Sequence, residues 1–445
     1  MRVLIKFFII ASIVFFSFFW FLDYNIEKKQ FTFKKLKSFI SKERITSLKN
    51  LYTDFIDIDF NETYEEKIVL SNKTINYVKY SNKIIKNRYY LDQNSENVFF
   101  ITPSGNLFYL IKKKLMSNEK KELVKINSNI QDVIGKDYIK EDRLIVKEIL
   151  ILEDEIFISY LFKKSGCYSN AILRGKLNLD YIKFSSFLKI KECKKRFNWA
   201  VGGNLKKFKD NQILLTVGDY NGYEDLSSKV YDEPQRKDSL YGKILSINLE
   251  TKEINILSMG HRNPQGVFYD EKEDIIYSTE HGPQGGDEIN ININPNPNNI
   301  KNYGWGISSY GEHYGADEGT SEKCKNNSDS SCEVYQRAPL YKSHSAYGFE
   351  EPFKYFTPSI GITEILKVIS KDKEGHLLLV ASMGDYKEEG DLTLHRIEID
   401  ENLNETKYDR IYTGERIRDI IDLGNGSILM SLESTGSFGI LENIY

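Results

Sequence analysis

The sequence has no long basic tract and few long amphipathic helical patterns. Its 445 residues carry a formal net charge of only −3. A nucleic-acid-binding surface needs a concentrated patch or stripe of Lys and Arg. We therefore expect no nucleic-acid partner, and the scarcity of helical periodicity favours a β-rich fold.

Cysteine is also scarce, with four residues in the whole chain. Cys324 and Cys332 lie in a polar loop that is short enough to close as a disulfide, and Cys167 and Cys193 are a second candidate pair. Disulfides are typical of exported domains. Four free thiols are the alternative.

The N-terminus contains one long apolar run, residues 7–22. This length is close to the roughly 20 residues that span a bilayer. The residues after it have no small-x-small cleavage pattern, which favours an uncleaved signal anchor over a cleaved signal peptide. We assign residues 1–23 to a transmembrane helix and residues 24–61 to a stalk or lead-in.

Two signals on membrane orientation disagree. Arg2 and Lys6 precede the apolar run and five lysines follow it closely, a balance that would keep the body of the protein inside. The candidate disulfides favour export. We expect a membrane-anchored protein whose body lies on the periplasmic or extracellular face.

From about residue 62 onward, one local pattern recurs: a polar or glycine-containing turn followed by a short apolar or alternating strand. Its six copies are residues 102–111, 152–161, 209–219, 271–282, 373–385 and 423–434. Apart from one wider gap that contains the Cys324 loop, their starts are roughly 50 to 60 residues apart, and a regular period indicates a solenoid or propeller. We predict an all-β, six-bladed β-propeller over residues 62–445. A pair of β-sandwiches is the alternative, but it leaves the even spacing unexplained.

Residues 260–290 concentrate glycine, proline, histidine, arginine and acidic residues in two loops. Arg262 and Asn263 lie in a turn before Pro264, where flanking glycines permit a tight backbone. A guanidinium held on a rigid turn can grip a planar carboxylate with two hydrogen bonds. A structural arginine that bonds loop carbonyls is the alternative.

The second loop, His281–Pro283 with the glycines and acids after it, follows a predicted strand. A Gly-Pro bend exposes main-chain carbonyls, and hard oxygen ligands suit Ca²⁺. Many acidic, glycine-rich turns bind nothing, so this loop alone is a weak signal.

Three segments together, GHRNPQG, TEHGPQGGDEIN and NYGWG (residues 302–306), resemble the glucose/sorbosone dehydrogenase family in order and spacing. Looser matches extend from about residue 100 to the C-terminus and leave the first hundred residues uncovered. The resemblance implies a six-bladed propeller that uses pyrroloquinoline quinone (PQQ), an ortho-quinone with three carboxylates, together with a calcium ion.

The resemblance also implies roles for particular residues. The cofactor-binding residues would be Arg262, Asn263, Arg416 and Arg418, and the backbone carbonyl ligands of calcium would be those of Gly282 and Pro283. Arg416 and Arg418 are two residues apart on a predicted strand and so share a face. Taken alone, that pair would fit a solvated strand face.

The chain departs from the family pattern at the proton acceptor. The family's general base, a histidine three residues before a Gly-Arg-Leu turn, aligns with Ala200, and the arginine of that turn aligns with Asn204. Met383 lies near the place of a cofactor-contacting lysine. Because positioned proton transfer contributes about 10²- to 10⁴-fold in rate, we expect slow or absent catalysis unless His281, or next His261, replaces the base.

These features predict a PQQ-dependent sugar or aldehyde dehydrogenase-like protein with a small-molecule substrate. One alternative is a non-catalytic propeller that binds carbohydrate or protein, because a fold alone does not decide function. Another is a calcium-dependent lactonase-like hydrolase, which needs carboxylates at the channel centre; Asp219, Asp287 and Glu288 are its candidates.

Overall fold

The computed structural model describes residues 58–444, except 71–72, 83–87, 118, 135–145, 165, 195–199, 221–232, 284, 312–343, 369–375 and 386–389. The predicted N-terminal anchor and the loop with Cys324 and Cys332 lie outside the described residues. All the described residues belong to one compact unit, Asp57–Tyr445.

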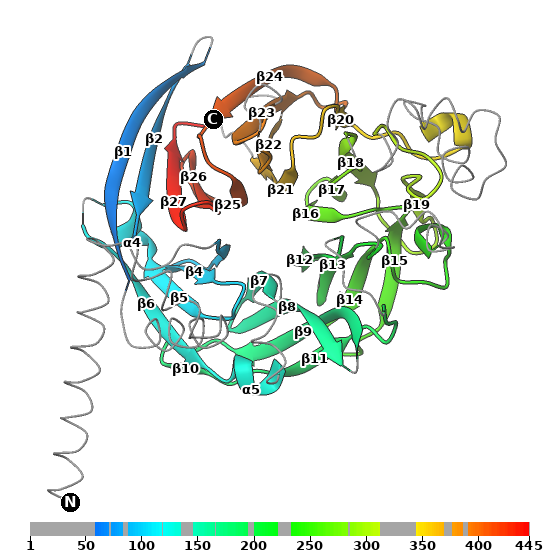
Figure 1. The fold of residues 1–445 in the computed structure, drawn as a ribbon, viewed down its shortest axis with the longest axis horizontal. Coiled ribbons are helices and arrows are strands. Elements are labelled where there is room, and N and C mark those ends of the chain that lie inside the picture. Colours follow the sequence, from blue (N-terminus) through cyan, green and yellow to red (C-terminus); the bar gives the residue numbers. More distant parts are fainter. Residues whose placement is uncertain are drawn as a thin grey trace, which may run out of the picture. The chain divides into compact units, whose positions relative to one another are not determined.

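This unit is all-β, and its strands form antiparallel groups that radiate from a central ring (Figure 1). From the centre outward, the first group is β3 (Tyr90–Gln93), β4 (Asn97–Ile101), β5 (Leu107–Ile111) and β6 (Lys121–Ser128). The second is β7 (Val146–Leu152), β8 (Glu155–Lys164), β9 (Cys167–Lys176) and β11 (Ser185–Lys189). The third is β12 (Gly202–Phe208), β13 (Gln212–Val217), β14 (Lys243–Asn248) and β15 (Ile254–Met259).

Three more groups complete the ring. The fourth is β16 (Pro264–Asp270), β17 (Ile275–Glu280), β18 (Asp287–Ile293) and β20 (Lys354–Phe356). The fifth is β21 (Ile362–Val368), β22 (His376–Ser382), β23 (Thr393–Ile399) and β24 (Glu405–Tyr412). The sixth is β25 (Ile417–Gly424), β26 (Ser427–Leu432), β27 (Ser437–Glu442) and β2 (Lys73–Ser81).

The remaining described elements are short or peripheral, except for the long strand β1 (Ile58–Leu70). Two-residue strands β10 (Tyr181–Ile182) and β19 (Lys301–Asn302) pair in parallel with β6 and β15. The helices are α4 (Lys112–Leu115), α5 (Ile130–Ile134) and the 3₁₀ helix η3 (His344–Tyr347). None of the helices in the described part of the chain combines the length and apolarity that a membrane crossing needs.

The two ends of the unit close the ring. Strand β2, near the start, pairs with β27, near the end, from Asn76 opposite Glu442 to Tyr80 opposite Phe438. Strand β1 pairs with β2 and also with β6 of the next group. The innermost strands contact one another in the order β3, β7, β12, β16, β21 and β25, and β25 contacts β3. The fold is therefore propeller-like, as the sequence predicted.

The hydrophobic core lies between neighbouring groups rather than inside the ring. For example, Phe99 of β4 belongs to the same buried cluster as Ile149 and Ile158 of the next group. Phe157 of the second group and Leu215 of the third group likewise belong to one buried cluster. Full burial of a side chain of this size contributes about 1.5–3 kcal/mol, so these clusters hold adjacent sheets together and leave the ring interior to polar groups.

The predicted repeat coincides with real strands, but one copy is out of phase. Five copies contain the second strand of a group, namely β8, β13, β17, β22 and β26. The copy at residues 102–111 contains β5, which is a third strand. The turn-and-strand pattern marks any buried strand after a tight turn, so it cannot number the strands within a group.

Bulges near the start of the innermost strands shape the ring interior. The pairing register shifts near Glu148 in β7, near Gly202 in β12, near Gly266 in β16, near Glu364 in β21 and near Asp419 in β25. A bulge bends a strand and re-aims its side chains. These shifts recur at equivalent places, so they turn side chains from several groups toward one region.

The backbone brings the surroundings of two cysteines together. Tyr168 and Lys194 form an isolated antiparallel bridge, each N–H donating to the other's carbonyl oxygen. Cys167 and Cys193 directly precede these two residues. The Cys167–Cys193 disulfide stays a prediction, which mass spectrometry without reduction can check.

Candidate functional site

The Arg262 turn is held by close main-chain contacts between β15 and β16. Gly260 has a φ of +73°, and a Cβ atom there would collide with Asn302 and Gly304. The main-chain N–H of Arg262 donates to Oε2 of Glu280, 2.7 Å away. Glycine and this carboxylate therefore fix the direction in which Arg262 leaves the turn.

The His281–Pro283 loop is organised by the buried carboxylate of Asp287. Its Oδ1 accepts from the N–H of Gly282 at 3.0 Å and from Ser359 Oγ at 3.1 Å. Its Oδ2 accepts from the N–H groups of Ile360 and Ile362, both at 3.0 Å. Both carboxylate oxygens of Asp287 thus hold the loop in place, so this side chain does not serve as a metal ligand at the channel centre.

Replacing Asp287 with asparagine is expected to lower the free energy of unfolding by about 2 kcal/mol, because an amide nitrogen cannot accept hydrogen bonds from these donors. Chemical denaturation measures the change. The control is Asp154→Asn, whose side chain is 67% exposed and pairs only across the surface with Lys176; it should shift stability by less than about 0.5 kcal/mol. Equal effects of the two variants would contradict this role of Asp287.

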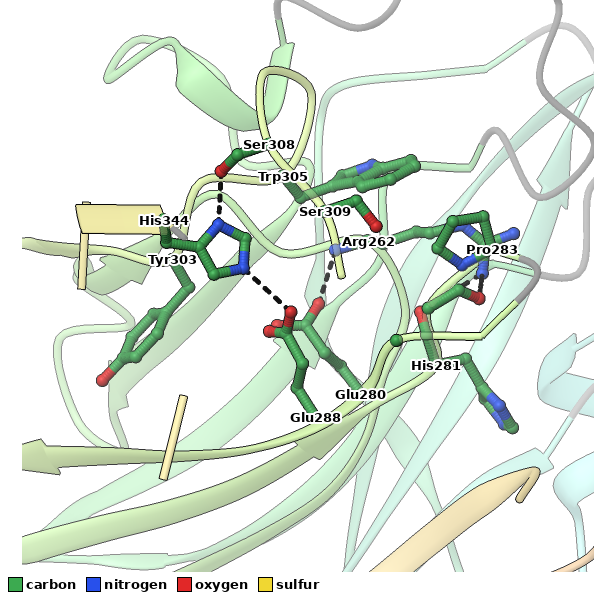
Figure 2. Close-up of a pocket in the computed structure, with 12 residues that line it drawn as sticks. Arg262, Glu280, His281, Pro283, Glu288, Tyr303, Trp305, Ser308, Ser309 and His344 are labelled. Carbon is green, nitrogen blue, oxygen red and sulfur yellow. Dashed lines mark hydrogen bonds and ion pairs between the residues drawn. The ribbon is translucent and has the colours of Figure 1, made fainter. Parts of the chain in front are cut away.

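The two loops meet through the guanidinium of Arg262 (Figure 2). Its NH1 donates to the carbonyl oxygens of Gly282 at 2.6 Å and of His281 at 3.2 Å. The guanidinium carbon lies 5.5 Å from the ring centre of Trp305, whose indole N–H donates to Asp219 Oδ2 at 2.7 Å. The carbonyl of Gly282, predicted as a metal ligand, therefore accepts a hydrogen bond from Arg262.

A chain of hydrogen bonds joins this turn to β25. Asn263 Oδ1 accepts from Gln265 Nε2 at 2.9 Å, and Gln265 Oε1 accepts from Arg418 NH1 at 3.3 Å. Arg418 Nε donates to Oε2 of Glu433 at 2.7 Å. Residues more than 150 positions apart thus form one connected polar surface at the same end of the ring.

Glu433 is the common partner of the arginines here. Arg418 and Arg88 form ion pairs with it, and Arg416 NH2 lies 3.9 Å from its Oε1. Arg416 is the more exposed guanidinium and also pairs with Asp385 at 3.0 Å. Burial alone would raise the pKa of Glu433, but Arg418 and Arg88 lower it to about 2. Glu433 is therefore a permanent anion among these cations.

The same cations act on His281 and Lys147. Burial, together with Arg262, Arg418 and Arg416, lowers the pKa of His281 to about 4. Burial and then Arg88 and Arg418 lower the pKa of Lys147 well below its usual value. His281 is consequently neutral at neutral pH and a weak proton acceptor. The sequence did not reveal Lys147, Arg88 or Glu433, because a lone charge gives no sign of distant partners.

The other predicted catalytic positions are also fixed by their surroundings. Ala200 is buried and has no ionisable group. Asn204 donates from its Nδ2 to Glu148 and Glu364 inside the ring. His261 is fully buried, with Ser258 Oγ 2.8 Å from its Nε2 and Glu280 Oε1 3.0 Å from its Nδ1. His261 is therefore locked in the loop and cannot reach a substrate.

A pocket opens beside Arg262, between the His281–Pro283 loop and the segment around Trp305 (Figure 2). Within it, Nε2 of His344 lies 2.9 Å from Oε1 of Glu288, and Nδ1 of His344 bonds to Ser308. Burial lowers the pKa of His344, but Glu288 raises it by more, to a net increase. His344 and Glu288 thus form a buried hydrogen-bonded pair, and sequence analysis missed His344 because its neighbours carry no recognisable motif.

The carboxylates predicted for a hydrolytic metal centre do not gather at the channel centre. Asp219 bonds to Trp305, Asp287 holds the loop, and Glu288 pairs with His344. Each has its own structural partner.

Comparison with known proteins supports the relationship suggested by the loops. A family model described as Glucose / Sorbosone dehydrogenase matches residues 152–440. An uncharacterized protein of Synechocystis sp. is 25% identical over 234 residues, which are 49% of this chain and 50% of that protein. Aldose sugar dehydrogenase YliI of Escherichia coli is 44% identical over 59 residues, 13% of this chain and 15% of that enzyme. The aligned part of the chain therefore covers half or less of the length of each of these relatives.

Solved structures extend the likeness to most of the fold. A crystal structure of a glucose dehydrogenase aligns with a TM-score of 0.59 and 18% identity, covering 80% of this chain and 96% of that chain. At this identity the likeness establishes the shared fold.

Proposed function

The chain belongs to the Glucose / Sorbosone dehydrogenase family, and we propose that it is a six-bladed, PQQ-binding, quinoprotein-type sugar or aldehyde dehydrogenase. The observation that carries the proposal is the convergence of Arg262 and Arg418 on one polar surface, linked through Asn263 and Gln265. In this proposal the N-terminal segment anchors the protein, and the propeller lies on the exported face.

The charge of this surface fits an anionic cofactor. Four arginines gather here among the described side chains. Arg88, Arg416 and Arg418 share Glu433. Arg416 also pairs with Asp385, and the guanidinium of Arg262 donates to main-chain carbonyl oxygens. PQQ carries three carboxylates, and guanidinium groups bind carboxylates through paired, charge-assisted hydrogen bonds. When bound, the quinone would supply the acceptor for the substrate's hydride.

Calcium can use the carbonyl oxygen of Gly282 as a ligand only if the Arg262 guanidinium gives up its hydrogen bond to that oxygen. The carbonyl oxygens of Gly282 and Pro283 are suitable hard ligands, but that of Gly282 accepts from Arg262 NH1 at 2.6 Å. An anionic cofactor would attract the same guanidinium and leave the carbonyl to the ion. Calcium binding here is therefore proposed to depend on the cofactor.

Proton transfer is the weak step of the proposed reaction. Ala200 cannot accept a proton, and His281, with a pKa of about 4, is a poor acceptor although it is neutral. Loss of a well-matched base costs about 10²- to 10⁴-fold in rate. We therefore propose a slow enzyme, or one that has kept its cofactor pocket and lost efficient catalysis. The second candidate is a non-catalytic binding propeller, which the absence of an ionisable group at Ala200 favours.

The test is to titrate detergent-solubilised full-length protein with PQQ in the presence of Ca²⁺ and to follow the cofactor's absorption spectrum. We expect saturable binding, followed by slow reduction of a dye acceptor when aldoses are added. Binding without reduction supports the lapsed-enzyme form of the proposal. Absence of binding overturns it.

A further inference from the structure

Three carboxylates from three different strand groups converge inside the ring. Glu148 of β7, Glu364 of β21 and Asp419 of β25 are each almost completely buried. One oxygen of each lies within 4.8 Å of the others. We call these three residues the axial cluster. It shares no residue with the His281–Pro283 loop or with the arginines around Glu433, although Asp419 directly follows Arg418 in the chain.

Each member is positioned in the same way. Each lies at a bulge of an innermost strand and precedes an isoleucine whose N–H donates to its carboxylate: Ile149 at 3.0 Å, Ile365 at 3.0 Å and Ile420 at 2.7 Å. This bond occupies Oε1 of both glutamates and Oδ1 of Asp419. The other oxygens of the two glutamates face Asn204 of β12. Oδ2 of Asp419 accepts from the N–H of Leu91 at 2.6 Å, so a cation would use the remaining lone pairs of the Asp419 carboxylate.

Lys206 is a close cationic partner of the axial cluster. Its Nζ lies 3.4 Å from Glu364 Oε2 and 3.9 Å from Glu148 Oε2. Arg418 also interacts electrostatically with Asp419. Asp92 lies near Lys206 as well, but it has Lys112 as a further cation. Buried carboxylates are normally paired or bind metal ions.

Asn204 gives an independent sign of a missing partner. Its side chain is 4% exposed, and its Nδ2 lies 2.9 Å from Glu148 Oε2 and 2.6 Å from Glu364 Oε2. Among the described residues, its buried Oδ1 has no hydrogen-bond partner. A half-turn of the amide would present Oδ1 to the space between the two glutamates.

We propose that Glu148, Glu364, Asp419 and Asn204 bind one divalent cation of the calcium class inside the ring. All four offer oxygen, which hard cations prefer. Calcium bonds oxygen at about 2.3–2.6 Å, so ligands on opposite sides of the ion are up to about 5 Å apart, and the observed oxygens fall within that limit. This site needs neither PQQ nor the proposed dehydrogenase function.

The test uses full-length protein without PQQ, stripped of metal by a chelator and then equilibrated with Ca²⁺. Elemental analysis should find about one equivalent bound. Glu364→Gln keeps the shape of the side chain but removes a charge and a ligand oxygen, so it should weaken Ca²⁺ binding at least about tenfold. Glu271→Gln is the control, because Glu271 is a 62% exposed partner of Lys207; its affinity should equal that of the unaltered protein.

Stability provides a second readout that does not depend on elemental analysis. Ca²⁺ should raise the melting temperature of the unaltered protein and of Glu271→Gln, and leave that of Glu364→Gln unchanged, because a ligand stabilises only the folded state that binds it. The proposal is overturned if the protein binds no Ca²⁺ or if Glu364→Gln binds it undiminished. It is also overturned if Glu364→Gln is the more stable protein with Ca²⁺ present, since Lys206 alone would then neutralise the cluster.

Discussion

Replacing Lys206 with methionine is expected to lower the free energy of unfolding by about 3–5 kcal/mol in metal-free buffer. The substitution keeps an unbranched side chain of similar length but removes the cation closest to Glu148 and Glu364. Both carboxylates are almost completely buried, so water cannot replace the lost charge. Urea denaturation of the purified protein at neutral pH measures the change.

Lys207→Met is the matched control, because Lys207 is the next residue on the same strand and its side chain is 53% exposed. Its pair with Glu271 lies on the surface, and its removal should cost less than about 0.5 kcal/mol. A loss of similar size in both variants would indicate a general effect of lysine replacement in β12 and would contradict the role of Lys206.

The loss of stability caused by Lys206→Met should depend on pH in one direction. The folded-state pKa values of Glu148 and Asp419 are raised, so these groups contribute stability below their unfolded pKa values, and this contribution is lost as pH rises through the folded values. Lys206 opposes the increase. Without Lys206, the pKa values of these carboxylates rise further. The decrease in the free energy of unfolding caused by Lys206→Met should therefore be larger at about pH 8 than at about pH 5. A deficit independent of pH would mean that lost packing causes it.

Sequence reasoning succeeded where local chemistry determines the structure. Tight turns followed by buried strands are visible in the residues themselves, so β8, β13, β17, β22 and β26 all coincide with predicted repeats. The first copy fell on a third strand because position within a sheet depends on pairing with distant residues. Ring closure by β2 and β27 is of this kind.

The loops of the candidate site were also predictable, because their backbones restrict residue choice. Gly260 and Gly282 are enforced by close approach of other main-chain atoms, and this requirement is what makes the loop motifs recognisable. The partners of Arg262 and Arg418 were not predictable in this way. Gln265 and Glu433 acquire their roles only through side-chain contacts across strand groups.

The axial cluster left a sequence signal that went unused. The segments KEI at 147–149, TEI at 363–365 and RDI at 418–420 place an acid before isoleucine at equivalent points of three innermost strands. An acid inside an apolar strand normally indicates a solvent-facing position. Here the bulges turn the side chains inward. The cationic surface and the axial cluster are therefore built from adjacent residues, Lys147 with Glu148 and Arg418 with Asp419.

Arg418→Met is expected to weaken PQQ binding by about 3 kcal/mol, which corresponds to a Kd about 100-fold higher. The side chain of Arg418 is 9% exposed and connects Gln265 with Glu433, so it is held in place before an anionic ligand arrives. Arg88 still neutralises Glu433 in the variant. Spectroscopic titration of the full-length protein with PQQ measures the affinity.

Arg396→Met separates this binding role from a general need for a buried arginine. The side chain of Arg396 is 5% exposed, against 9% for Arg418, and it forms comparable ion pairs with Glu398 and Asp409. It lies on β23, however, two strands out from the ring. Its replacement should lower stability by a similar amount because it also leaves carboxylates unpaired, while PQQ affinity stays unchanged. If both variants lose affinity equally, the loss comes from destabilisation of the propeller. If neither loses affinity, the cofactor does not contact Arg418, and the arginines around Glu433 serve the fold alone.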